Sequence, residues 1–240
     1  MENNFNPWLE NQLQMLISVK TKDELLTGLS EASKLLGFDY FSYGLRSSMP
    51  VSAPKIAFVS NYPLHYQQLY LAKNYLDIDP IVHLCMKTTT PVIWEENLFL
   101  NARSLWEDCN AAGLHHGWSQ SSFLRSGICG MLTLARSNDA LTAKELAYRA
   151  PILVWFNQLA QVGLSHILLP DMVQASQVKL TARETEIMRW TADGKTACEI
   201  SMILSVAERT VNFHINNVLS KFNVTSKIAA TVQAVLLGVI

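Results

Sequence analysis

The chain has 240 residues, a length that is typical of one or two domains. Apolar residues make up 49% and charged residues 16%, so the chain is rich in core-forming residues and is not a disordered protein. The formal net charge of −1 excludes a chain that is basic throughout. The charge is uneven, because residues 179–240 carry seven Lys and Arg against five Asp and Glu. The C-terminal part is therefore the better candidate for an anionic partner.

The sequence shows no sign of a membrane span or a secretory signal. No stretch reaches about 18 consecutive apolar residues, and the first 20 residues contain Glu2, Pro7 and Glu10. The four cysteines are far apart and form no C-x-x-C pair: Cys85, Cys109, Cys129 and Cys198. We expect a cytoplasmic protein that does not bind membranes and whose reduced thiols are packed as small apolar side chains.

Capping boxes indicate where several helices begin. In this motif the side chain of a Ser or Thr accepts the backbone N–H of a Glu three residues later. The Glu side chain in turn accepts the backbone N–H of the Ser or Thr. Thr21 and Glu24 predict a helix that ends near residue 37, and Thr142 and Glu145 predict a long helix that ends near residue 167. Three further boxes follow in the C-terminal part: Thr181/Glu184, Thr196/Glu199 and Ser205/Glu208.

Between the first two boxes, short segments rich in aromatic, β-branched or alternating apolar residues predict strands over 38–45, 55–60, 117–124 and 128–136. Arg125-Ser126-Gly127 is a plausible hairpin turn between the last two strands. Shorter helices are expected over about 63–73, 79–86 and 102–112. The order of these elements predicts an α+β protein whose N-terminal part is an α/β/α sandwich around an antiparallel sheet.

A domain boundary is expected near residues 168–178, where a Pro and small polar residues replace the periodicity of the long helix. We expect one domain over 1–168, a linker over 169–178 and a smaller helical domain over 179–240.

Two capped segments, 196–204 and 205–222, follow one another with almost no connection. In the second, apolar residues recur every three or four positions and form one helix face, while the opposite face carries Arg209, Asn212 and Asn216. Arg bonds the edge of guanine and Asn that of adenine, so this pattern fits the reading helix of a helix-turn-helix unit. Spacing alone also allows an ordinary amphipathic surface helix. The flanking residues that could contact phosphates are Lys195, Thr196, Thr210 and Lys221.

Three tyrosines, Tyr62, Tyr66 and Tyr70, are spaced by four residues and can line one side of a helix that follows Pro63. Asp79 follows nine residues later. A carboxylate among aromatic rings is costly unless it is hydrogen-bonded. Either a ligand donates an N–H to it while the rings enclose the ligand's apolar part, or Asp79 caps the next helix. Spacing alone favours the cap.

Residues 179–240 resemble the DNA-binding domain of LuxR-type quorum-sensing regulators. The segments that carry the resemblance are 180–196, Glu199-Ile200, 203–205 and 209–217, and Met188 stands where the family prefers Leu. The resemblance implies a four-helix unit whose last helix, about 226–237, helps to dimerise. It also implies that Arg209, Asn212 and Asn216 face base edges.

The N-terminal part resembles the acyl-homoserine-lactone-binding domain of the same family. The resemblance rests on Tyr62-Pro63, Tyr70, Asn74-Tyr75, Asp79-Pro80, Trp94, Gly117 and the segment 131–136. It implies that Asp79 accepts the amide N–H of the signal and that Tyr62 donates to the amide carbonyl. It further implies that Tyr70 packs on the acyl chain and that Trp94 packs on the lactone ring.

The same resemblance implies roles for four more residues. Thr133 adds a polar contact from the sheet, Gly117 leaves room for the backbone to approach, and Pro80 belongs to the site through the Asp79-Pro80 pair. Tyr66 stands where the family usually has a tryptophan that bonds the lactone carbonyl. A phenol also donates, but with a different reach and angle, so Tyr66 either bonds this carbonyl or the pocket accepts a different amphiphile.

These observations predict a transcription regulator that senses an N-acyl-homoserine lactone and binds a palindromic operator in double-stranded DNA as a homodimer, without a cofactor. The alternative is the same architecture that responds to a non-lactone amphiphile or acts without a ligand. An enzyme is not expected, since the common nucleophile, phosphate-loop and zinc motifs are missing from the sequence. The adjacent pair His115-His116 does not predict a metal site. A phosphorylated response regulator would need an early acidic cluster after a first strand, whereas this chain begins with helices.

Overall fold

The computed structural model describes residues 21–48, 54–124, 127–172 and 179–240. The chain divides into two compact units, of which the first comprises residues 1–123 and 128–172 and the second comprises residues 124–127 and 173–240. Each unit has its own core and is described separately below.

The first unit is built on a five-stranded sheet with the order β2-β1-β5-β4-β3. The four predicted strands are confirmed, and a short β3 at one edge adds to them. β1 pairs antiparallel with both β2 and β5, and β3 pairs antiparallel with β4. The proposed turn at Arg125-Ser126 lies outside the described residues. The strands are β1 (Tyr40–Ser47), β2 (Ile56–Ser60), β3 (Val92–Ile93), β4 (His116–Leu124) and β5 (Ile128–Arg136).

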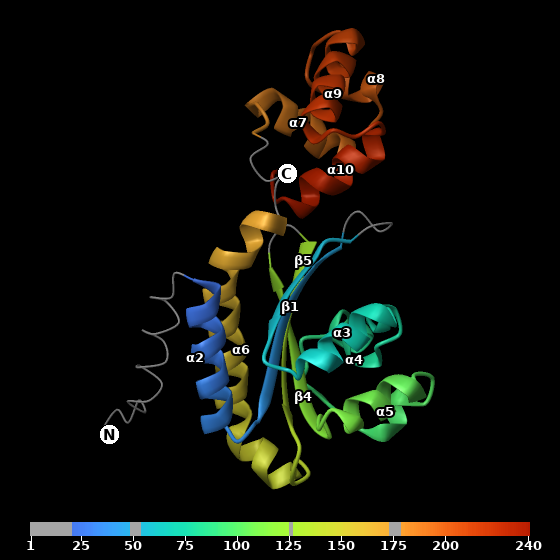
Figure 1. Ribbon diagram of the computed structural model, residues 1–240. Coiled ribbons are helices and arrows are strands. Elements are labelled where there is room, and N and C mark those ends of the chain that lie inside the picture. The colour runs from blue at the N-terminus through green and yellow to red at the C-terminus, as the bar shows by residue number, and fades with distance from the viewer. Residues whose placement is uncertain (1–20, 49–53, 125–126, 173–178) are drawn as a thin grey trace, which may run out of the picture. The chain divides into compact units, whose positions relative to one another are not determined.

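Helices cover both faces of this sheet, which confirms the predicted α/β/α sandwich. Figure 1 shows α2 and α6 on one face and α3, α4 and α5 on the other. The helices of this unit are α2 (Lys22–Leu35), α3 (Leu64–Ala72), α4 (Pro80–Cys85), α5 (Arg103–Ala111) and α6 (Ala143–Met172), and two short 3₁₀ turns occur at Tyr75–Asp77 and Glu96–Phe99. α6 extends beyond the expected end and includes the first residues of the predicted linker over 169–178. Residues 173–178 of that linker lie outside the described residues.

β1 shows why the two faces of the sheet differ. Its side chains alternate between half-buried and buried, as the period of two in a strand requires. Phe41, Tyr43 and Leu45 are almost fully buried. The residues between them, Ser42 and Gly44, belong to the opposite face, which is the face covered by α3 and α4.

The second unit is a bundle of four helices, as predicted for 179–240. Its core has two adjoining parts, one around Met188 and Phe222 and one around Ile187 and Ile200. The apolar face expected for the reading helix is confirmed by the burial of Val211, Ile215, Val218 and Phe222. The helices are α7 (Ala182–Ala192), α8 (Ala197–Ile203), α9 (Glu208–Phe222) and α10 (Lys227–Leu236).

Three of the predicted capping boxes are complete, those at Thr21, Thr181 and Thr196. The box at Ser205/Glu208 is wrong. Ser205 adopts a left-handed conformation with a φ of 51° in the connection between α8 and α9. The N-cap of α9 is Ala207, whose methyl group offers no hydrogen-bond acceptor, so α9 begins at Glu208 without a side-chain cap.

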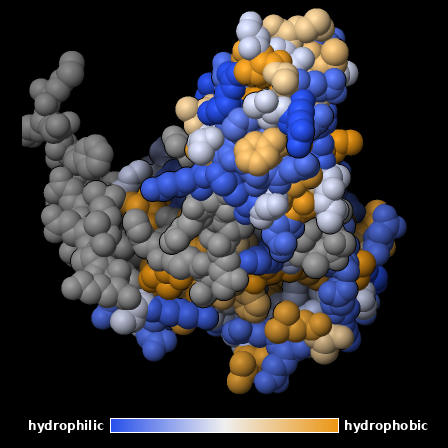
Figure 2. All heavy atoms as spheres, turned by 90° about the horizontal axis from the view of Figure 1, so that it is seen from above, coloured by the Kyte–Doolittle hydropathy of each residue, from blue (hydrophilic) through white to orange (hydrophobic). Residues whose placement is uncertain are grey.

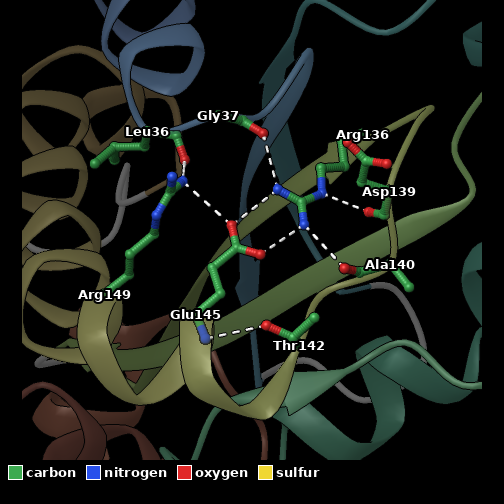
Figure 3. Close-up of polar contacts among 8 residues, drawn as sticks. All are labelled: Leu36, Gly37, Arg136, Asp139, Ala140, Thr142, Glu145 and Arg149. Carbon is green, nitrogen blue, oxygen red and sulfur yellow. Dashed lines mark hydrogen bonds and ion pairs between the residues drawn. The ribbon is translucent and has the colours of Figure 1, made fainter.

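The box at Thr142/Glu145 is half formed, because the Glu145 carboxylate has stronger partners. The Thr142 hydroxyl accepts the Glu145 backbone N–H, but the carboxylate binds Arg136 in two parallel hydrogen bonds of 2.9 and 2.7 Å and contacts Arg149 at 3.4 Å. Both arginines also bond backbone carbonyls of the segment that follows α2: Arg149 bonds Leu36, and Arg136 bonds Gly37 (Figure 3). This network therefore joins the end of β5, the start of α6 and the end of α2.

Within the described residues, no helix is long and apolar enough to cross a membrane. On the face of the molecule seen in Figure 2, hydrophilic residues predominate and apolar residues occur in small groups between them.

We predict that Glu145→Gln lowers the free energy of unfolding at pH 7 by about 1–3 kcal/mol, because it removes a charge-assisted bidentate pair. Hydrogen bonds from Arg136 lower the pKa of Glu145, so this stabilisation is fully present above the pKa that Glu145 has in the unfolded chain. It is lost as the pH falls through the lowered pKa of the folded state. Urea unfolding of both proteins at neutral and acidic pH measures the difference.

Glu107→Gln is the matched control, since Glu107 forms only an exposed pair with Arg103 at 3.4 Å. Such a change is expected to alter the stability by less than about 0.5 kcal/mol. Equal stability of Glu145→Gln and the original protein at pH 7 contradicts the prediction.

Candidate functional site

A cavity of about 360 Å³ lies between the sheet and the helices of the α3–α4 side. Its wall is predominantly apolar and aromatic, with a small number of polar groups, as is typical of sites for small molecules. Six of the residues expected to bind a ligand line this cavity: Tyr62, Tyr66, Tyr70, Asp79, Trp94 and Thr133. The structure thus brings together residues of α3 and β5 with residues that lie directly before α3, before α4 and after β3.

The tyrosines form a continuous row along α3. Ring centroids are 6.0 Å apart between Tyr62 and Tyr66 and 6.1 Å apart between Tyr66 and Tyr70. The row continues to Tyr40 at one end and to Tyr75 at the other. The spacing of four residues predicted that these rings share one side of a helix, and this is confirmed for Tyr66 and Tyr70, which lie in α3. Tyr62 precedes the helix and joins the row through its contact with Tyr66. The row provides one wall of the cavity.

Of the two roles that the sequence left open for Asp79, the structure shows the helix cap, and the two carboxylate oxygens have different partners. Oδ1 accepts the backbone N–H of Ile81 at 2.8 Å and of Val82 at 3.4 Å, which makes Asp79 the N-cap of α4. Oδ2 accepts the hydroxyl of Tyr70 at 2.9 Å. Burial raises the pKa of Asp79, and these three hydrogen bonds oppose that shift. The cap is therefore confirmed, and a carboxylate at the cavity wall is held in a fixed orientation.

Tyr66 has a partner that the sequence analysis did not anticipate. Its hydroxyl lies 2.8 Å from Sγ of Cys109, and either atom can be the donor. Both side chains line the cavity, and burial raises the pKa of the Cys109 thiol to about 12. The thiol therefore stays neutral, and it fixes the position of the phenol that stands at the family's tryptophan position.

Trp94 and Thr133 belong to one chain of hydrogen bonds. Nε1 of Trp94 donates to Oγ of Ser119 at 3.0 Å, and this hydroxyl donates to Oγ1 of Thr133 at 3.0 Å. Because the Thr133 oxygen accepts this bond, its own hydrogen is free to point to an acceptor in the cavity. Ser119 was not among the expected residues, and only the folding of β4 against β5 reveals it.

Gly117 and Pro80 act next to the cavity and do not line it. A Cβ at position 117 would overlap the indole of Trp94, so the glycine makes room for this ring. Pro80 is the first residue of α4, where a missing N–H costs nothing because no partner exists for it in the helix.

Two further tyrosines and a further cysteine of the wall are neutral. Burial raises the pKa of Tyr62 and of Tyr70 far above the usual range, and it raises that of Cys85 to about 12. Within the described residues the Tyr62 hydroxyl has no protein partner, so it can donate to a guest molecule. The cavity therefore combines an apolar wall with the Asp79 acceptor and the Tyr62 and Thr133 donors. This set fits a neutral amphiphile with an N–H or O–H and a carbonyl in its head group.

The sheet contributes wall residues that the sequence analysis missed. β1 presents Ser42, Gly44 and Arg46 to the cavity, and β2 presents Ile56 and Phe58. In β1 the wall residues alternate with buried apolar residues, and this period of two in the sequence could have identified them. It was missed for Arg46 because the predicted strand ended at Leu45.

In the second unit, the predicted base-reading residues lie on the exposed side of α9. Arg209, Thr210, Asn212 and Asn216 are all exposed, on the helix face opposite to the buried one. Phe213 lies among them and is 59% exposed. This arrangement is a polar helix face presented to a partner, which is what base reading in the major groove requires.

The expected phosphate contacts are not equally available. Lys195 is half-buried, and Thr196 is exposed but caps α8 by accepting the N–H of Glu199 at 3.2 Å. The ammonium of Lys221 lies 2.6 Å from the carboxylate of the buried Glu184 and pairs with it. Hydrogen bonds from Lys221 and from Thr181 lower the pKa of Glu184 although burial opposes them. The structure therefore gives Lys221 an internal role that the sequence analysis did not foresee.

No group of three or more His, Cys, Asp or Glu side chains in the described part of the chain is arranged to hold a metal ion. Both ring nitrogens of His115 lie near backbone carbonyl oxygens, Nδ1 at 2.6 Å from Ser137 and Nε2 at 3.0 Å from Asn110. All four cysteines are free thiols.

Comparison with known proteins agrees with this geometry. Residues 21–162 match the autoinducer binding domain, and residues 178–234 match the domain described as bacterial regulatory proteins, luxR family. The transcriptional activator protein AnoR of Acinetobacter nosocomialis is 39% identical over 238 residues, which are 97% of this chain and 99% of the relative. The regulatory protein SdiA of Escherichia coli strain K12 is 33% identical over 242 residues and is covered to 99%.

A solved structure of SdiA in complex with octanoyl-rac-glycerol has the same fold over the whole chain. Its TM-score is 0.82 at 31% identity, and the match covers 100% of this chain and 98% of that one. The resemblance seen in the sequence is therefore confirmed at the level of family and fold. The chain belongs to the LuxR family of bacterial transcription regulators, which are not enzymes, and consists of an autoinducer-binding domain followed by a helix-turn-helix DNA-binding domain.

Proposed function

We propose that this protein senses an N-acyl-homoserine lactone in the cavity of its first unit and, as a cytoplasmic homodimer, activates transcription from a palindromic operator. The observation that carries the proposal is the carboxylate of Asp79 at the wall of a predominantly apolar cavity. The amide N–H of the signal would donate to Oδ2 of Asp79, and its carbonyl would accept from Tyr62. The acyl chain would lie against the tyrosine row and the sheet, and the lactone ring against Trp94.

A second candidate is a non-lactone amphiphile with the same pattern of donors and acceptors. It is favoured by the bond between Tyr66 and Cys109, which holds the phenol that would otherwise reach the lactone carbonyl. The SdiA structure contains an acylglycerol, whose head group carries hydroxyl donors and an ester carbonyl. An acylglycerol could use Asp79 and Tyr62 in the same way as an amide.

The proposed dimer is supported by α10. Ile228, Val232 and Val235 are exposed by 76%, 37% and 53%, and their spacing of four and three places them on one side of the helix. An apolar stripe of this kind suits packing against the same helix of a second copy. Two copies would present two α9 helices to two half-sites about one turn of DNA apart. The signal would favour the dimer-competent state because it binds only that state.

The proposal predicts that a lactone with a medium-length acyl chain raises the melting temperature of the full-length protein in a concentration-dependent manner. A ligand that binds only the folded state stabilises it by about 2.7 kcal/mol at a hundredfold excess over the Kd. Differential scanning fluorimetry with lactones of several lengths, beside a monoacylglycerol series, measures this. Stabilisation by the acylglycerols alone favours the second candidate, and the absence of any shift contradicts both.

We predict that Asp79→Asn weakens lactone binding at least about tenfold, or 1.4 kcal/mol. Asn caps helices about as well as Asp, so α4 should remain intact, but an amide is a poorer acceptor than a carboxylate for the N–H of the signal. Titration calorimetry gives the Kd, and Asp77→Asn is the matched control, because Asp77 is exposed and bonds only Asn74. An unchanged Kd removes Asp79 from the head-group site.

We predict that Asn216→Ala reduces binding to the specific operator by about 1–3 kcal/mol and relaxes specificity at one base position. Lys195→Ala, which removes a proposed phosphate contact, is expected to weaken specific and random DNA alike and to reduce the salt dependence. Fluorescence anisotropy with both DNAs at two salt concentrations separates these effects. Equal losses on specific and random DNA for Asn216→Ala contradict its role as a base reader.

A further inference from the structure

The sheet side of the cavity has an ordered pattern of three rungs across β2, β1 and β5. Antiparallel register places Ser42 opposite Ser60 and Thr133, and two residues further along it places Gly44 opposite Phe58 and Met131. Two residues beyond that, Arg46 lies opposite Ile56 and Cys129. All nine residues line the cavity. The wall therefore changes from small hydroxyl side chains through an apolar middle to a cation.

Arg46 is not neutralised by the protein that surrounds it. Within the described residues no carboxylate forms an ion pair with it, and its guanidinium donates no hydrogen bond to a protein atom. Its Nε is buried without a partner, although the side chain as a whole is only half-buried. Its charge lies close enough to Cys129 to oppose the burial that raises the pKa of this thiol to about 11. The sequence from 47 to 60 contains no acidic residue.

A buried donor of a charged group without a partner is costly, so it needs an acceptor from outside the protein, either a solvent molecule or a ligand. Arg46 also differs from the residues of the neighbouring rungs, because its guanidinium offers no favourable contact to an apolar acyl chain. We propose that Arg46 recognises an oxygen acceptor, a hydroxyl or a carboxylate, near the far end of the acyl chain of the signal. This inference rests on the proposed function of the cavity and specifies the tail of its ligand.

The register also gives the scale of that ligand. The four residue steps of β1 from Ser42 to Arg46 span about 13 Å at 3.3 Å per residue. The rung of Ser42 contains Thr133, which belongs to the head-group end through Ser119 and Trp94. An extended chain advances about 1.2 Å per bond, so about eleven bonds separate the two ends. A medium-length chain with a polar tail therefore matches both ends of the cavity, with Asp79 at the head and Arg46 at the tail.

The test compares three homoserine lactones of equal length on the full-length protein: decanoyl, ω-hydroxydecanoyl and ω-carboxynonanoyl. Titration calorimetry gives the Kd of each for the original protein, for Arg46→Met and for Arg46→Lys. We expect Arg46→Met to keep or improve the binding of the apolar decanoyl probe. We also expect it to reduce the preference for an oxygen-bearing tail by at least about threefold, and by about tenfold where a full charge-assisted bond is lost. Arg46→Lys should retain part of the preference, since it keeps the charge.

Arg189→Met is the control for the loss of one positive charge, because Arg189 is exposed on α7 in the other unit. Arg46→Gln repeats the test with a neutral polar side chain if Arg46→Met lowers the melting temperature of the unliganded protein. A preference that changes by less than about threefold in these variants, while the decanoyl probe still binds, overturns the role of Arg46 alone. If none of the probes binds the original protein, the proposed function fails for lactones and this inference fails with it.

Discussion

The pleat of the central sheet is the constraint on which the first unit depends. Because side chains alternate between faces, β1 can place Phe41, Tyr43 and Leu45 in the core and leave Ser42 and Arg46 on the other side. Helices α2 and α6 cover the first face, so the second is free to form the wall of a cavity beneath α3 and α4 (Figure 1). A shift of one residue in the register would exchange the two sets, and both the core and the cavity would be lost.

The polar groups of the cavity are fixed by structural tasks before any ligand arrives. Asp79 is oriented because it caps α4 and accepts the Tyr70 hydroxyl, and Trp94 is oriented because its indole N–H bonds Ser119. The absence of a side chain at Gly117 gives the indole its place. A site held in this way needs little reorganisation on binding, which favours affinity and selectivity. The cost is that substitutions at these positions affect local structure as well as binding, which is why the matched variants above are needed.

Charged side chains serve the same two purposes in each unit. Glu145 and Glu184 are largely shielded from solvent and are neutralised by arginines or a lysine that join separate elements of the chain (Figure 3). Arg46 has no such partner within the described residues, and Arg209 is exposed on α9. A cation that the fold does not neutralise is available to an anion or a polar acceptor from outside. Arg46 lies at the wall of the cavity, and Arg209 lies on the face proposed to read DNA.

The sequence alone predicted most of the secondary structure, the two-part organisation and six residues of the cavity wall, because these depend on local patterns. Periodic apolar residues and capping boxes located most of the helices, the spacing of Tyr66 and Tyr70 placed their rings on one side of α3, and the family resemblance pointed to Asp79. Only the tertiary structure decided which partners those side chains have. The bond between Tyr66 and Cys109, the chain from Trp94 to Thr133 and the pairing of Lys221 with Glu184 join residues that are far apart in the chain. Strand register and helix packing bring such pairs together, and no pattern along the sequence encodes those distances.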